Sequence, residues 1–313
     1  MTSSRLLGSA RFGVMFAISL WGGPGWLVLP ACADETDTVA AFFKDEPAAH
    51  GLYDEMVDAM RKADSLSFVS HYKWRVKDEV VGDFTYRAWL KKPNYFRVEV
   101  EARDSGETRG ILIGDGTTAW LHWPHGRPQW GLVPEDPTAY QRTRFSSYRK
   151  SLAPAGEYSI GHALEYSAEN MFYPIVDPST FHGFADSLQA YLDGVKRLGT
   201  EMVGSEACDK IEVSIMNQQR SWFLWLSQRD HLPRKLEQIV RVSNVAVMNE
   251  EWSSVVVNGD LPETLFEWKP PEGWKEWVRP EPEDSLLKPG TKAPDFDLLS
   301  ADGKRIKLSD YRG

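Results

Sequence analysis

Residues 95–102 read Tyr-Phe-Arg-Val-Glu-Val-Glu-Ala, and apolar and charged side chains alternate through the whole stretch. Positions 96, 98, 100 and 102 are apolar, and positions 97, 99 and 101 are charged. Because successive side chains of a β-strand point to opposite faces, this pattern predicts a strand with one covered face and one wet face. The same alternation at 68–76 and 84–90 predicts neighbouring antiparallel strands.

Further strands are predicted on both sides of a long irregular stretch. Residues 110–123 contain Asp115-Gly116 between two apolar runs, which is a strong hairpin signal because the turn needs positive φ. Residues 124–183, with many Pro, Ser and aromatic positions, are expected to be an irregular excursion. Later strands are expected at 208–215, 221–226, 233–242 and 245–257, which makes one antiparallel sheet of eight to eleven strands.

Two amphipathic helices are expected to pack on this sheet. Residues 51–63 place Leu52, Met56, Met60 and Ala63 on one helical face. A second helix is predicted at 184–198 from a similar spacing of Phe184, Leu188, Tyr191, Val195 and Leu198. The predicted fold class is therefore α+β.

Composition narrows the classes of function. The chain has 313 residues, is 42% hydrophobic and 26% charged, and carries a formal charge of −9, so it is neither disordered nor typical of a nucleic-acid-binding protein. Its two cysteines, Cys32 and Cys208, cannot build a disulfide scaffold or a four-cysteine zinc site. Cys208 is expected to be a buried structural residue.

No catalytic, metal or cofactor site is predicted. The phosphate-binding, dinucleotide-binding and serine-hydrolase motifs are absent from the sequence. The spacing of His122 and His125 could indicate a metal site, but Pro124 bends the chain between them and the sequence indicates no third ligand. This pair is therefore interpreted as part of a loop. The carboxylate pairs Glu250-Glu251 and Glu55/Asp58 are interpreted as solvated faces.

The first 33 residues have the three parts of a secretory signal peptide. Arg5 and Arg11 precede an apolar stretch from 12 to 29, and Ala31-Cys32-Ala33 forms a small-residue cleavage pattern. Cleavage after Ala33 is predicted, with export to the periplasm or the medium. An alternative stays open, because Leu29-Pro30-Ala31-Cys32 also resembles a bacterial lipoprotein signal in which Cys32 would be lipidated.

The order of elements resembles the periplasmic lipoprotein-carrier (LolA-type) superfamily. The resemblance rests on 92–98, Gly114-Asp115-Gly116 with Trp120, and the later stretches 204–208, 222–225, 232–234 and 265–271, and it spans about 50–275. It implies a curved antiparallel half-barrel with helices on its concave side, where acyl chains are held. The predicted domain covers 34–275.

The tail resembles a different family. Residues 287–313, after a linker at 276–286, contain G-x-x-A-P-x-F, an Asp-Gly hairpin and Leu-Ser-Asp-Tyr-Arg-Gly. This order is similar to the opening of the thioredoxin-like redoxins, namely the peroxiredoxin and TlpA-like thiol oxidoreductases. No redox cysteine motif is present. The tail is therefore expected to be an incomplete thioredoxin-like N-terminal hairpin, truncated from a longer two-domain protein.

A ligand-binding apolar face is the remaining prediction for the half-barrel. Both faces of 221–226 are apolar, which is more apolar surface than one helix-covered face requires. The candidate lining residues are Phe84, Tyr86, Phe96, Val98, Trp120, Phe223 and Trp225.

Three hypotheses of function follow. The leading one is an exported protein that binds a lipid, lipoprotein or other apolar ligand, with helix 184–198 as a lid and a redoxin domain in the intact protein. The second is a periplasmic sensing or protein-interaction module. The third is a thiol-disulfide oxidoreductase or peroxidase, with a membrane-proximal redox partner, if the chain is a fragment.

Overall fold

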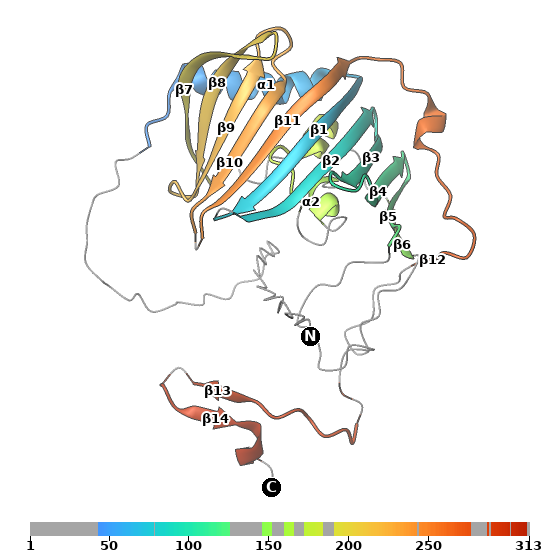
Figure 1. The fold of residues 1–313 in the computed structure, drawn as a ribbon, viewed down its shortest axis with the longest axis vertical. Helices are drawn as coiled ribbons and strands as arrows, with labels where there is room; N and C mark the ends of the chain where they lie inside the picture. Colours follow the sequence, from blue (N-terminus) through green and yellow to red (C-terminus); the bar gives the residue numbers. More distant parts are fainter. Residues whose placement is uncertain are drawn as a thin grey trace, which may run out of the picture. The chain divides into compact units, whose positions relative to one another are not determined.

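The computed structural model describes residues 43–77, 79–125, 146–151, 160–165, 172–183, 191–242, 244–276, 287, 289–300 and 302–311. Within these residues one large antiparallel sheet dominates (Figure 1). The helical elements that lie wholly within the described ranges are α1 (Pro47–Lys62), α2 (Ile160–Glu165) and the short 3₁₀ helices η2 (Pro178–His182), η4 (Glu263–Phe266) and η6 (Leu308–Tyr311). The predicted signal peptide, Cys32 and most of the predicted linker 276–286 lie outside the described residues.

The strands follow the chain in two runs. The first run is β1 (Ser65–Val76), β2 (Glu79–Lys91), β3 (Tyr95–Ala102), β4 (Thr108–Asp115), β5 (Thr118–Trp123) and β6 (Ser146–Ser151). The second run is β7 (Leu192–Val203), β8 (Glu206–Ile215), β9 (Arg220–Ser227), β10 (Pro233–Val240), β11 (Ala246–Val257) and the two-residue β12 (Lys275–Glu276). A separate hairpin pairs β13 (Asp297–Leu299) with β14 (Arg305–Lys307).

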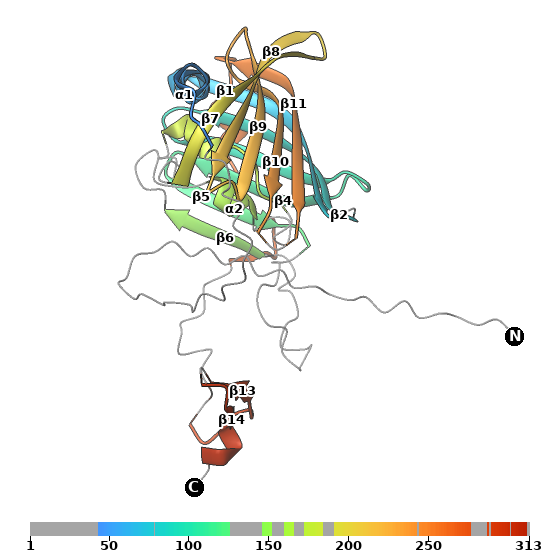
Figure 2. The ribbon, with the colours of Figure 1, turned by 90° about the vertical axis from the view of Figure 1, so that its left-hand side faces the viewer.

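The two runs join through their first and last long strands. The strand order is β12-β6-β5-β4-β3-β2-β1-β11-β10-β9-β8-β7, and β1 pairs with β11 along nearly its whole length. One continuous core contains side chains from β5 and from β8, although seven strands lie between these two in the sheet. The sheet therefore curls around its core, and Figure 2 shows this curvature from the side. We call the core-lining side the inner face and the opposite side the outer face.

The sequence pattern predicted these strands well. The pair Phe96–Gly114 lies in the β3–β4 ladder, and the predicted hairpin at Asp115-Gly116 joins β4 to β5. Gly116 has a φ of 90°, and Asp115 Oδ1 accepts hydrogen bonds from the backbone N–H of Thr117 and Thr118 at 2.9 and 2.7 Å. The predicted large antiparallel sheet is confirmed, but in the described part of the chain it has twelve strands instead of eight to eleven, and its two-residue β12 pairs with β6 in parallel.

Helix α1 forms for the predicted reason. Its apolar side is buried at Ala49, Tyr53, Met56 and Met60. Met56 and Met60 belong to the same core as the inner face of the sheet, so the helix covers that face. Pro47 occupies the first turn, where its missing N–H costs no helical hydrogen bond. Glu55 and Asp58 are exposed, as expected.

The second predicted helix is wrong over 192–198. These residues begin β7, which pairs with β8 through Val195↔Val213 and Arg197↔Ile211. Gly194 and Gly199 have φ of 157° and 128°, which are not helical values, so backbone pairing with β8 overrides the apolar spacing. Residues 184–190 lie outside the described residues. The excursion at 124–183 contains β6, α2 and η2 within its described parts.

The C-terminal hairpin β13–β14 has the turn that the sequence indicated. Gly303 has a φ of 78°, and Ser300 N donates to Lys304 O at 2.8 Å across the turn. Leu298 and Leu299 are exposed. No helix among the described residues is long and apolar enough to cross a membrane.

Candidate functional site

The predicted aromatic face divides between the two sides of the sheet. Phe84, Tyr86, Phe96 and Val98 are buried in the core on the inner face. Phe223, Trp225 and Trp120 alternate with core residues of β9 and β5 and therefore lie on the outer face. The structure thus brings four of the seven together and separates the other three.

On the outer face, Trp225 is covered by charged side chains. The Nζ atoms of Lys210 and Lys235 lie 4.5 and 4.6 Å from its ring centroid, and its Nε1 donates to Glu201 Oε2 at 2.7 Å. Lysine stems can shield an aromatic ring while their ammonium groups stay in water. For Trp225, the cover that the second apolar face of β9 requires is therefore supplied by the chain itself.

Trp120 and His122 also lie on the outer face, against the segment that follows β11. The Trp120 and His122 rings lie 5.5 and 4.9 Å from the ring of Trp268, and His122 lies 4.4 Å from Trp274. Burial lowers the pKa of His122 to about 4, so this ring is neutral near pH 7. His125 Nε2 lies 3.2 Å from Glu107. The described residues contain no cluster of metal-ligating side chains.

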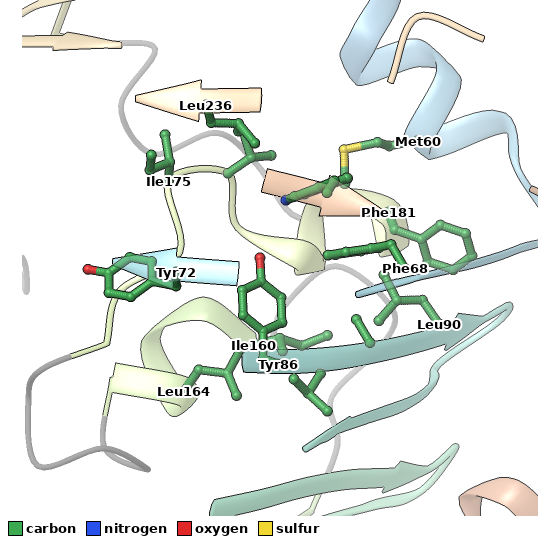
Figure 3. Close-up of a cluster of buried hydrophobic side chains, with 14 of the residues drawn as sticks. Met60, Phe68, Tyr72, Tyr86, Leu90, Ile160, Leu164, Ile175, Phe181 and Leu236 are labelled. Atoms are coloured by element: carbon green, nitrogen blue, oxygen red, sulfur yellow. The ribbon is translucent and has the colours of Figure 1, made fainter. Parts of the chain in front are cut away.

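A separate segment covers the aromatic inner face. Residues 172–182, which we call the strap, contact side chains of β1, β2 and β11. Phe172 makes edge-to-face contacts with Tyr72 and Tyr86 at 4.8 and 5.0 Å. Ile175 and Phe181 are buried in the same core. Figure 3 shows Ile175, Phe181 and the α2 residues Ile160 and Leu164 among side chains from α1 and the sheet. The strap makes no backbone-to-backbone hydrogen bond to a described strand.

One carboxylate attaches the strap to the centre of the sheet. Glu250 on β11 is fully buried and faces the core beside Tyr72 and Leu236. Its Oε1 accepts from the backbone N–H of Ile175 at 2.5 Å, and its Oε2 accepts from Tyr86 OH at 2.6 Å. Ser70 Oγ and Trp252 Nε1 donate to the same Oε2 at 3.1 and 3.2 Å.

The interpretation of Glu250-Glu251 as a solvated pair is therefore wrong for Glu250, whereas Glu251 is exposed. The sequence of β11 contained a signal for the burial of Glu250. Met248, Glu250 and Trp252 are alternate residues of one strand and therefore point to the same face, and two of the three are apolar. Burial raises the pKa of Glu250, and the four donors act against this increase. Burial and the nearby carboxyl group raise the pKa of Tyr86 well above its usual value. The cluster is a satisfied polar network inside an apolar core.

The other end of the strap is held at the β2–β3 turn. His182 Nε2 donates to Tyr95 O at 3.1 Å and lies 3.4 Å from Lys91 O. Lys92 Nζ donates to Phe181 O and lies 4.4 Å from the Phe181 ring centroid. Burial lowers the pKa of His182 to about 4. Asp177 Oδ1 also accepts from Gly161 N at 2.9 Å, which connects the strap to α2.

Cys208 is buried, as expected, on the outer side of β8. Burial raises the pKa of its thiol, and its Sγ contacts Glu206 O at 3.7 Å. A raised pKa leaves little thiolate near pH 7, so this cysteine is not a nucleophile of the usual kind.

Comparison with protein families gives a match over part of the chain. Residues 170–276, which include the strap and β7–β12, match the family described as "Predicted periplasmic protein (DUF2092)". No curated protein gives a significant match.

Several solved structures are similar to this chain at low identity. The lipoprotein LppX of Mycobacterium tuberculosis is 13% identical with a TM-score of 0.38, over 70% of this chain and 99% of that one. A LolA superfamily protein from Nitrosomonas europaea is 13% identical with a TM-score of 0.31, over 70% and 97%. The MucA/MucB complex of Pseudomonas aeruginosa is 14% identical with a TM-score of 0.38, over 83% and 74%.

Proposed function

We propose that this protein binds the acyl chain of a lipid or lipoprotein on the inner face of its sheet. The observation that carries the proposal is the way in which the strap covers that face. Phe172 fills the space over Tyr72, Phe84 and Tyr86, but among the described residues the strap is held by side chains and not by a strand ladder. A strap of this kind can leave the face without breaking the sheet.

An acyl chain can replace the strap at modest cost. The departing apolar side chains and the incoming methylene groups both bury apolar area, and each buried methylene contributes about 0.8 kcal/mol. The polar contacts that must break include the Ile175–Glu250 hydrogen bond, which a water or a lipid hydroxyl can replace. Phe84, Tyr86, Phe96 and Val98 are proposed as the lining.

The test is a titration of the delipidated protein with palmitate, followed by calorimetry. Phe172→Ala removes the competitor for the aromatic face and is expected to tighten palmitate binding. The matched control is Phe266→Ala, because Phe266 is equally buried but packs on Tyr95 outside the core cluster, with 5.6 Å between ring centroids. Absence of palmitate binding, or equal tightening in both variants, contradicts the proposal.

Export to the periplasm is part of the proposal. The family description and the signal-like sequence of 1–33 support it, with cleavage after Ala33 or lipidation of Cys32 as the two outcomes. Mass spectrometry of the mature N-terminus in a bacterial host distinguishes them. An intact Met1 would contradict both.

A protein partner is a second candidate, and the edge strand β7 favours it. The backbone of Val195 and Arg197 is capped by Asp45 and Glu46, but the strand continues to Val203. Leu198 and Met202, both in this continuation, are exposed. An exposed strand edge with apolar side chains is suited to strand addition by an extended peptide. Met202→Lys is expected to abolish such binding while palmitate binding is unchanged.

For the tail, we propose the start of a thioredoxin-like redoxin domain with thiol oxidoreductase activity in a longer protein. The β13–β14 hairpin and the exposed Leu298, Leu299 and Tyr311 support this, because such a hairpin needs further strands to be stable. The test is sequencing of the gene downstream of codon 313. A redox cysteine in the downstream sequence is expected, because the thiolate is the nucleophile of this chemistry.

A further inference from the structure

Four strands place a line of side chains across one end of the inner face. Trp74 on β1 is opposite Met248 on β11, Met248 is opposite Gln238 on β10, and Gln238 is opposite Trp222 on β9. Directly opposed residues in antiparallel strands point to the same side of the sheet. Three strand spacings of about 4.8 Å make this row about 14 Å long. Figure 1 shows these four strands side by side.

Two hydrogen-bond donors in the row have no acceptor. The indole N–H groups of Trp74 and Trp222 are buried and make no hydrogen bond in the described part of the chain. Trp222 is only 6% exposed, and Gln238 beside it is 3% exposed. Buried N–H groups are nearly always paired in folded proteins, because an unpaired one loses its hydration without compensation.

Two other tryptophans show that the chain supplies acceptors elsewhere. Trp252 Nε1 donates to Glu250, and Trp225 Nε1 donates to Glu201. Both acceptors are carboxylate oxygens. Of these four tryptophans, the two with unpaired indole groups both lie at this end of the inner face.

An arginine without a carboxylate lies next to the row. Arg220 is two residues before Trp222 on β9 and is opposite Val240 and Ile215, which are both core residues. It therefore lies on the inner face. Its Nε is buried without a hydrogen-bond partner, and among the described residues it forms no ion pair. By contrast, Arg234 on β10 and Arg197 on β7 each pair with carboxylates.

We propose that Arg220, Trp222, Trp74 and Gln238 bind the oxyanion headgroup, carboxylate or phosphate, of an acyl-chain ligand. This inference rests on the proposed function and adds the class and orientation of the ligand. A guanidinium and indole N–H groups donate to oxyanions, and charge-assisted hydrogen bonds are the stronger kind. Along β9 the inner face continues from Trp222 to Leu224 and Leu226, which are core residues. The headgroup therefore lies at the start of β9, and the acyl chain extends toward the strap.

The experiment compares three probes of the same acyl chain length. These are palmitate, palmitoyl-lysophosphatidylglycerol and the neutral monopalmitoylglycerol, each titrated calorimetrically into the delipidated protein at fixed ionic strength. The wild type is expected to bind one or both anionic probes at least tenfold more tightly than the neutral probe. Comparison of the two anionic probes shows whether the carboxylate or the phosphate is preferred.

Two variants locate the headgroup. Arg220→Gln is expected to remove the tenfold preference while changing the affinity for the neutral probe less than twofold. Trp222→Phe keeps the apolar area, removes one N–H, and is expected to reduce the preference about fivefold. The matched control is Arg241→Gln, because Arg241 contacts Ser221 Oγ at 3.0 Å on the outer face and has the same charge. This control is expected to keep the preference.

The failures are distinguishable. If no probe binds, the proposed function fails and this inference fails with it. If the neutral probe binds as tightly as both anionic probes, or if Arg241→Gln and Arg220→Gln lose the preference equally, only the headgroup site is refuted. Arg220→Met provides a readout without lipid, since removing an unpaired guanidinium is expected to raise or preserve the midpoint of thermal unfolding. A large decrease would show that Arg220 has a structural role and would refute the site.

Discussion

Replacement of Glu250 by leucine tests the polar network most sharply. The side chain is fully buried and accepts four hydrogen bonds, from Tyr86, Ile175, Ser70 and Trp252. The two hydroxyl groups can rotate toward other acceptors, but the N–H groups of Ile175 and Trp252 cannot. Each unpaired buried N–H costs about 1–3 kcal/mol, so Glu250→Leu is expected to lower the free energy of unfolding by about 2–6 kcal/mol.

Glu250→Gln is expected to cost less, about 1–3 kcal/mol, because the amide keeps one acceptor oxygen and leaves one N–H unpaired. The control Glu251→Gln changes an exposed neighbour and should stay within about 0.5 kcal/mol. Urea denaturation followed by circular dichroism measures all three variants. Full stability of Glu250→Leu would refute the claim that this carboxylate holds the strap.

The same network predicts a pH dependence with a definite sign. Burial raises the pKa of Glu250 in the folded protein above its ordinary 4.5, so the folded state holds the proton more tightly than the unfolded state. This contribution to stability is complete below the unfolded pKa and is lost as the pH rises through the folded pKa. The free energy of the wild type relative to Glu250→Gln should therefore decrease as the pH rises above about 4.5. An increase would contradict the assigned direction.

Two further predictions concern stability. A Cβ on Gly114 would lie 2.4 Å from the Phe96 ring, so Gly114→Ala should lower the free energy of unfolding by about 1–3 kcal/mol. A Cβ on Gly51 in α1 would meet nothing within 4 Å, so Gly51→Ala should raise the free energy of unfolding by about 0.5–1 kcal/mol. Equal effects in urea denaturation would contradict this reasoning. Burial lowers the pKa of His182 from 6.5 to about 4. The contribution of neutral His182 to the free energy of unfolding is therefore complete above pH 6.5, and about 3 kcal/mol of it should be lost as the pH falls to 4. Burial also lowers the pKa of His122 to about 4, so both histidines contribute to the loss of stability at low pH. His182→Gln should therefore remove about half of the pH dependence that the two histidines produce together. A pH profile of His182→Gln that matches the wild type would show that this histidine is not buried neutral.

The strands were predictable because their alternation is a local property. In β3, every second residue from Phe96 to Ala102 is buried, as the pattern indicated. Helix α1 was predictable for the same reason, since Met56 and Met60 follow a helical period. The strand at 192–198 was not, because its apolar spacing fits a helix and only pairing with β8 selects the extended backbone.

The candidate site was less predictable, since it depends on contacts between distant segments. Ile175 and Glu250 are 75 residues apart, and only the folded sheet shows that the strap crosses β11. Which face of the sheet is covered also cannot be read from one strand. For this reason Phe84 and Trp225 were predicted to line the same face, although the structure places them on opposite sides of the sheet.

The most direct test of the central claim is photo-crosslinking with a palmitate that carries a diazirine near the end of its chain. After irradiation and digestion, crosslinked peptides are identified by mass spectrometry. The account predicts labels on the inner-face residues of β1, β2 and β9 and on the strap around Phe172. Labels confined to the outer face around Trp120 and Trp225, or no label that unlabelled palmitate displaces, would contradict it.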